Sequence, residues 1–174
     1  MRFRASVLLA CLLLWCGRAQ AVDGVSAEFG QGHGIWLWRL GAQWDWSDRW
    51  AFRVRDWHGR VYWDVNAGVW EQAVSTIYDL GVTPVVRLEH ERAHGSPYLE
   101  LGIGPHMLSS LEVTPYRTFT THLQFGSFVG AGLRFGYEER YDVGVRLQHI
   151  SNAGIENPNP GINFLQLRLQ YHYP

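Results

Sequence analysis

A histidine and a serine lie two residues apart near the end of the chain, in the stretch LQHISNAG (147–154). A serine hydroxyl becomes an effective nucleophile when a neighbouring base accepts its proton, and histidine commonly acts as that base. Alternate residues of a β-strand share a face and lie about 6–7 Å apart at their Cα atoms. If this segment is a strand, His149 and Ser151 can therefore form a nucleophile–base pair for acyl transfer.

Such a pair also needs a group that holds the imidazole and donors that stabilise an oxyanion. Asn163 has the same parity as the apolar residues of the last alternating segment, which predicts that it lies on the same face as His149. The backbone N–H groups around Asn152 and Gly154 are the expected oxyanion donors. The alternative is that a strand simply ends here, with polar side chains at its end.

Apolar and polar residues alternate with a period of two along the whole chain, which indicates β-strands. The expected strands are eight, an even number, and each is close to the about 9–11 residues that cross a bilayer when tilted. They are 24–31, 34–46, 60–70, 82–91, 97–106, 122–136, 140–151 and 162–173.

Two all-β architectures fit this pattern, a soluble β-sandwich and a transmembrane β-barrel. A barrel is favoured because the polar face carries charges of both signs and tryptophans lie near strand ends on the apolar face, as in interfacial girdles. The expected fold is therefore an all-β, eight-stranded antiparallel up-and-down transmembrane β-barrel. Side chains fill a barrel of this size, so chemistry must sit at a rim, on loops or on the outer wall. The charged residues of the polar face are Glu28, Arg39, Asp45, Asp64, Arg87, Glu89, Glu100, Arg134, Arg146 and Arg168.

The first 21 residues have the basic start, apolar run and A-x-A ending of a secretory signal peptide. Cleavage after Ala21 would leave residues 22–174 as one barrel domain. Both cysteines fall in the removed segment, so the mature chain has no disulfide. The net charge of the chain is −1, and it has no basic footprint for a nucleic-acid partner.

An exported barrel with an even strand count has both termini in the periplasm. The seventh strand then runs outward, which predicts that His149, Ser151 and Asn163 lie near the outer leaflet of a bacterial outer membrane. The long connections 71–81, 107–121 and 152–161 are expected outside, with 47–59 as the exception on the periplasmic side. Ionisable groups that face hydrocarbon are costly and are functional candidates for that reason.

The motif HISNAG (149–154), followed by PNPG (158–161), resembles the signature of lipid A 3-O-deacylases of the PagL type. The resemblance extends over essentially the whole chain, and the last hairpin is its specific part. It implies an outer-membrane serine esterase that remodels lipopolysaccharide by removing the 3-O-linked 3-hydroxyacyl chain of lipid A, without a metal or other cofactor.

The resemblance also implies a role for each site residue. Ser151 would be the nucleophile, His149 the general base, and Asn152 with the Gly154 amide the oxyanion site. The family carries a glutamate that orients the histidine, and its place matches Asn163 here. Either Asn163 performs this task with its amide oxygen, or Glu156 on the following loop supplies the charge.

Other functions stay open on sequence grounds. A non-enzymatic small barrel for adhesion or membrane structure is the main alternative, and an outer-membrane phospholipase is another. A homodimer is also compatible with the sequence. The segment HERAH (90–94) matches the zinc motif H-E-x-x-H, but that motif needs a helix, and here it ends a β pattern. No zinc site is therefore expected.

Overall fold

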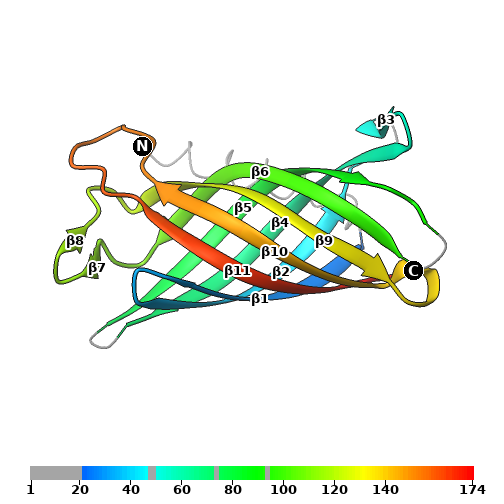
Figure 1. Cartoon of the computed structure of the whole chain (residues 1–174). Coiled ribbons are helices and arrows are strands. Elements are labelled where there is room, and N and C mark those ends of the chain that lie inside the picture. Colours follow the sequence, from blue (N-terminus) through cyan, green and yellow to red (C-terminus); the bar gives the residue numbers. More distant parts are fainter. Residues whose placement is uncertain (1–20, 47–49, 73–74, 93–94) are drawn as a thin grey trace, which may run out of the picture.

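Eight antiparallel strands close into a barrel in the computed structural model, which describes residues 21–46, 50–72, 75–92 and 95–174 (Figure 1). Each strand pairs with its neighbours in the chain, and the first pairs with the last, which confirms the predicted fold class. The barrel strands are β1 (Gly24–Gly32), β2 (Ile35–Asp45), β4 (Trp57–Glu71), β5 (Thr76–Glu89), β6 (Ser96–Leu108), β9 (Leu123–Phe135), β10 (Tyr141–Ser151) and β11 (Ile162–His172).

Short elements decorate the two ends of the barrel. A hairpin of β3 (Phe52–Val54) with the start of β4 extends one end, where a 3-10 turn (Tyr137–Glu139) joins β9 to β10. A second hairpin, β7 (Glu112–Thr114) and β8 (Arg117–Thr118), lies at the other end. In the described part of the chain, no helix is long and apolar enough to cross a membrane. The predicted signal peptide lies almost wholly outside the described residues, so cleavage after Ala21 stays a prediction.

One predicted connection was wrong. The segment 71–81 is not a long loop, because β5 begins at Thr76 rather than at 82. Asp79 and Gly81 belong to β5 instead, and both are buried inside the barrel. The Asp79 carboxylate is satisfied there by the Arg39 guanidinium at 2.8 Å and by His106 Nδ1 at 2.8 Å. The connections 109–122 and 152–161 are long, close to the prediction, and residues 47–49 of the predicted 47–59 connection lie outside the described part.

Charged side chains of both signs fill the barrel interior. Glu100 accepts hydrogen bonds from Arg87 Nη2 at 2.7 Å, from Arg146 Nε at 2.6 Å and from Tyr62 Oη at 2.7 Å. Arg146 also donates to Asp64 at 2.8 Å. Buried charges are tolerated only when they are paired and hydrogen-bonded in this way. Most of the predicted polar face is therefore buried inside, while Asp45, near one strand end, is only half-buried.

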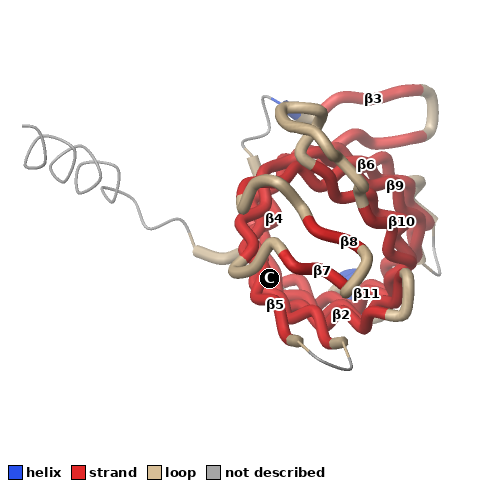
Figure 2. The backbone as a smooth tube through the Cα atoms, turned by 90° about the vertical axis from the view of Figure 1, so that its left-hand side faces the viewer, coloured by secondary structure: helices blue, strands red, loops and turns tan. Residues whose placement is uncertain are grey.

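An apolar cluster closes the interior at the end that carries the β7–β8 hairpin. The hairpin crosses the barrel mouth (Figure 2), and its buried Val113 packs on this cluster. Ile150 and Ile162 belong to the same cluster, so the inner sides of β10 and β11 are packed just where these strands carry the candidate site. The other members are Ile35, Leu37, Trp70, Ile77, Leu108, Phe119 and Phe164.

The two ends of the barrel are distinct. Gly24 pairs with His172, so the starts and ends of the barrel domain lie together, at the right in Figure 1. The loop 152–161 and the β7–β8 hairpin lie at the opposite end. The outer wall between them exposes apolar side chains, among them Leu165, Leu167 and Leu169 of β11.

Candidate active site

His149 and Asn163 face each other across the β10–β11 pair on the outer wall. They are direct cross-strand partners, and both side chains are exposed. His149 Nδ1 lies 2.7 Å from Asn163 Oδ1. An amide oxygen can only accept, so this bond places the imidazole hydrogen on Nδ1 and leaves Nε2 as an acceptor for a proton. The structure thus brings Asn163 to the ring of His149, where the sequence placed it.

Ser151 is the last residue of β10 and is buried, with 9% of its surface exposed. It lies two residues beyond His149 on the same strand, but the hydrogen bonds of the described residues include none between the two side chains. Catalytic hydrogen bonds are often long in structures without substrate and tighten when substrate binds. The strand therefore places Ser151 and His149 near each other, but no hydrogen bond joins their side chains among the described residues.

Gly161 makes room for the imidazole ring. Its φ angle is +52°, and a Cβ atom at this position would lie 2.7 Å from His149 Cε1 and 3.2 Å from Nε2. A side chain here would displace the ring, because real Cβ atoms do not approach other atoms so closely. The end of the 152–161 loop thus lies against the edge of the ring that would accept the serine proton.

Asn152 organises the loop that follows Ser151. Its Nδ2 donates to Glu156 O at 2.7 Å and to Thr120 Oγ1 at 2.8 Å, while its Oδ1 accepts from Gly154 N at 2.9 Å. Its backbone N–H donates to Asn159 Oδ1 at 3.1 Å. Both backbone amides expected at an oxyanion site are therefore engaged within the loop here, and each would have to exchange its partner for substrate.

Arg117 joins the β7–β8 hairpin to the end of the same loop. Its Nη1 donates to Pro160 O at 3.1 Å and also to Gly161 O. Together with the bond from Asn152 to Thr120, this contact holds the 152–161 loop against the 109–122 loop. Sequence reasoning missed Arg117 and Thr120, because contacts between distant loops have no periodic signal, and it gave Asn159 no role of its own. Asn159 does lie within the PNPG segment of the motif.

Replacing Arg117 with alanine is expected to lower kcat about tenfold and to change KM little. The hydrogen bonds from Arg117 to Pro160 O and Gly161 O, here called the Arg117 clamp, hold Gly161 beside His149. Small displacements of a group that takes part in the reaction lower kcat more than they weaken binding. Arg117→Lys should recover part of the rate, since an ammonium can still donate to one carbonyl. Steady-state kinetics on purified lipid A would measure both variants.

Arg140→Ala is the matched control for this experiment. Arg140 pairs with the exposed Glu138 at the far end of the barrel, so its loss should leave kcat unchanged. A normal kcat in Arg117→Ala would show that the hairpin does not position the site.

The segment HERAH (90–94), from which no zinc site was expected, does not form a helix in the described residues. His90 and Glu91 directly follow the end of β5, and His94 lies outside the described part. Within the described ranges, no group of three or more His, Cys, Asp or Glu side chains is placed to hold a metal ion.

Comparisons with known proteins agree with the fold and identify the family. The family model for lipid A 3-O-deacylase (PagL) matches residues 36–172. The lipid A deacylase PagL of Pseudomonas aeruginosa is 33% identical over 166 residues, covering 93% of this chain and 92% of the relative. The lipid A deacylase PagL of Bordetella bronchiseptica is 28% identical over 181 residues, covering 95% and 93%.

A solved structure supports the same conclusion. The crystal structure of the outer membrane enzyme PagL superposes with a TM-score of 0.77 at 32% sequence identity, covering 86% of this chain and 99% of that one. The family match, the two relatives and this structure all span nearly the entire barrel. The chain therefore belongs to the lipid A 3-O-deacylase (PagL) family.

Proposed function

We propose that this chain, an outer-membrane lipid A 3-O-deacylase, is a serine esterase with Ser151 as nucleophile and His149 as general base. Asn163 orients the base. The observation that carries the proposal is the 2.7 Å bond between His149 Nδ1 and Asn163 Oδ1 on the outer wall. This bond leaves His149 Nε2 as the proton acceptor. Ser151 follows His149 by two residues on the same strand.

The reaction follows from these positions. His149 Nε2 takes the proton of Ser151 Oγ as this oxygen attacks the carbonyl carbon of the ester at position 3 of lipid A. Asn152 and the Gly154 amide stabilise the oxyanion once they turn from their partners within the loop. Collapse of the tetrahedral intermediate breaks the ester bond, and His149 returns the proton to the sugar oxygen. Water, deprotonated by His149, then releases the 3-hydroxy fatty acid from Ser151.

The proposed site lies near the outer leaflet, where lipid A resides. Support comes from its place at the end of the barrel opposite the chain termini, because barrels of even strand number keep both termini in the periplasm. The proposed residues all belong to one chain, so the reaction needs no second copy. A homodimer stays a prediction, which the molecular mass of the detergent-solubilised protein would test.

A long-chain alkyl fluorophosphonate tests the proposed nucleophile directly. Attack by Ser151 Oγ on phosphorus would expel fluoride and leave a phosphonyl group on the peptide that contains residues 147–154. Peptide mass spectrometry should find this adduct in the wild-type protein, none in Ser151→Ala, and far slower labelling in His149→Ala. An adduct on another serine of the wild-type protein would contradict the assignment.

Two residues could support the His149 ring, Asn163 or Glu156, and the two hypotheses predict opposite effects of substitution. If Asn163 holds the ring, Asn163→Ala should lower kcat about 10–10²-fold, less than the about 10⁴ seen when the orienting acid of a protease triad is altered. Asn163→Glu should preserve or raise the rate, because a carboxylate also stabilises the charged imidazolium. Kinetics on purified lipid A would measure both.

Glu156→Gln is the control variant for this experiment and should leave kcat nearly unchanged. The Glu156 side chain is exposed, and among the described residues only its backbone oxygen contacts the site, through Asn152. If kcat instead fell strongly in Glu156→Gln and only slightly in Asn163→Ala, Glu156 on the loop would be the residue that supports His149.

A further inference from the structure

The β3–β4 hairpin extends the barrel at the end that carries the chain termini (Figure 1). It consists of β3 and the first residues of β4, joined by a turn at Arg55 and Asp56. Among the described strands, β3 pairs with β4 alone and stays outside the closed ring. Connections on the periplasmic side of such barrels are normally short. Closure of the barrel therefore does not explain this hairpin.

One face of the hairpin is apolar and continues the lipid-facing wall of the barrel. Side chains alternate between the two faces of a strand, so Trp57 shares the outward face of β4 with Trp63. Val54 is the cross-strand partner of Trp57, and Phe52 is the partner of Gly59, so both also lie on this face. The Phe52 ring covers Gly59, where a Cβ atom would overlap it. The outward face of β4 thus extends onto the hairpin.

The apolar side chains of this face are exposed. The exposed fraction is 43% for Phe52 and 52% for Val54, and it is 58% for the neighbouring Trp50. Trp50 packs edge to face on Trp46, with ring centroids 5.2 Å apart, and Trp46 contacts Trp63 at the same distance. The aromatic surface is therefore continuous from the barrel wall to the hairpin. Contiguous exposed apolar surface of this kind marks a site of interaction with a membrane or a protein.

The opposite face of the hairpin is polar. Arg53 is the cross-strand partner of His58, and His58 Nδ1 lies 3.6 Å from Glu91 Oε1. Arg60, farther along this face of β4, donates to Asp45 at 2.8 Å. A segment with one apolar and one charged face is suited to the boundary between hydrocarbon and water.

The position of the hairpin favours a lipid surface as the partner of its apolar face. Viewed from the end of the barrel, the hairpin projects outside the ring of strands and does not fold over the barrel mouth (Figure 2). Its apolar face is continuous with the wall that contacts membrane hydrocarbon, and tryptophans gather where such walls meet lipid headgroups. Both ends of the barrel domain lie at this side, so the adjoining lipid is that of the periplasmic leaflet.

We propose that the β3–β4 hairpin is a membrane anchor, which buries Trp50, Phe52 and Val54 in the phospholipid of the periplasmic leaflet. Arg53 and His58, on the other face, stay in water. This inference goes beyond the proposed function, because none of these residues belongs to the candidate active site.

Single cysteines that carry a fluorophore test the two faces separately. Both native cysteines lie in the predicted signal peptide, so each variant of the mature chain has one labelling position. The protein is reconstituted in vesicles of phosphatidylethanolamine and phosphatidylglycerol. Nitroxide-labelled lipid should quench a probe at Val54→Cys about threefold more than one at Arg53→Cys, because the apolar face of an interfacial segment lies about 5–10 Å deep. Iodide, present on both sides of the membrane, should quench the two probes in the opposite order.

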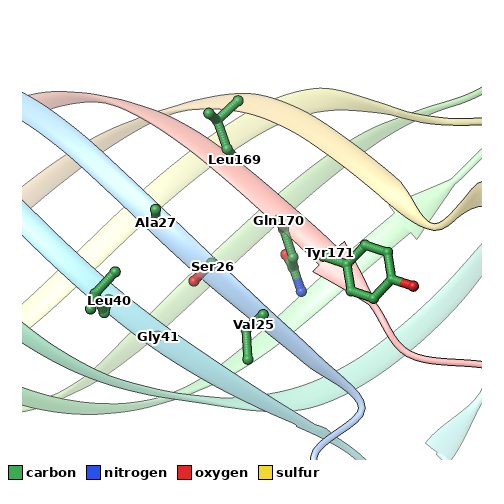
Figure 3. Close-up of a pocket in the computed structure, with 8 residues that line it drawn as sticks. All are labelled: Val25, Ser26, Ala27, Leu40, Gly41, Leu169, Gln170 and Tyr171. Carbon is green, nitrogen blue, oxygen red and sulfur yellow. The ribbon is translucent and has the colours of Figure 1, made fainter.

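Two reference positions calibrate the quenching. Leu40→Cys lies on the lipid-facing wall, in an apolar depression formed by β1, β2 and β11 (Figure 3), and should give the full effect of lipid nitroxide. Tyr116→Cys lies at the fully exposed tip of the β7–β8 hairpin and should respond to iodide alone.

A charge on the apolar face should release the hairpin from the lipid. Phe52→Asp, added to the Val54→Cys protein, should lower lipid-nitroxide quenching to the level of the Arg53→Cys probe. Arg53→Asp is the matched control, because it places the same carboxylate on the polar face, and it should leave the Val54→Cys probe in lipid. The barrel should fold in both variants, since β3 lies outside the closed ring of strands. Gel mobility before and after heating would verify this.

Two results would overturn the inference. Equal quenching of the Val54→Cys and Arg53→Cys probes by iodide would show that the hairpin stands in water. Protection of the Val54→Cys probe from iodide without quenching by lipid nitroxide would show that a protein surface, such as a second copy of this chain, covers the face instead. Neither result would affect the assignment of Ser151 and His149, since none of these measurements involves turnover.

Discussion

Replacement of Ser151 by alanine is expected to lower the rate of lipid A deacylation by at least about 10³-fold. Nucleophile and base act as one unit in serine hydrolases, where the loss of either can cost about 10⁶-fold in kcat. The minimum loss expected here is smaller than that value, because His149 is held by a neutral amide rather than by a carboxylate. His149→Ala should lose a similar factor, and the double variant should lose little more than either single one.

The barrel should fold normally in both variants. Neither side chain belongs to the apolar cluster at the barrel mouth or to the ion pairs of the interior. Ser110→Ala serves as the matched control, because among the described residues its hydroxyl accepts only from the Glu112 backbone N–H, at the same end of the barrel. Turnover of lipid A in Ser151→Ala above one tenth of the wild-type rate would rule Ser151 out as nucleophile.

Glu100→Ala is expected to lower the free energy of unfolding by about 3–5 kcal/mol, as found when one partner of a buried ion pair is removed. The carboxylate accepts from Arg87, Arg146 and Tyr62 in the middle of the barrel. Its loss leaves two buried guanidinium groups with less compensation. Denaturant unfolding in detergent micelles, followed by tryptophan fluorescence, would measure the change.

Glu138→Ala is the matched control for stability. Glu138 also pairs with an arginine, Arg140, but at the exposed end of β9, where solvent screens the pair. Its unfolding midpoint should match that of the wild-type protein. A Glu100→Ala variant as stable as Glu138→Ala would mean that water or rearranged arginines replace the lost carboxylate inside the barrel.

Most of what could be predicted from the sequence followed from the alternation of side chains between the two faces of each strand. Because side chains alternate strictly between the two faces of a strand, residue types alone placed His149 and Asn163 on the same outer wall. The cross-strand pairing of these two residues and their hydrogen bond agree with that prediction. The same rule predicted which charges lie inside.

Contacts between distant segments escaped sequence reasoning. Asp79 is buried in β5 because its partners Arg39 and His106 come from other strands of the barrel, which the sequence around 71–81 does not reveal. The Arg117 clamp depends on how two long loops meet, which no periodicity encodes.

Mass spectrometry of lipid A incubated with the purified, detergent-folded protein tests the central claim most directly. The account predicts a product lighter by one 3-hydroxyacyl chain, lost from position 3, together with one equivalent of free 3-hydroxy fatty acid. The Ser151→Ala protein should give neither. Unchanged lipid A with the wild-type protein, or release of fatty acid from phospholipids instead, would contradict the account.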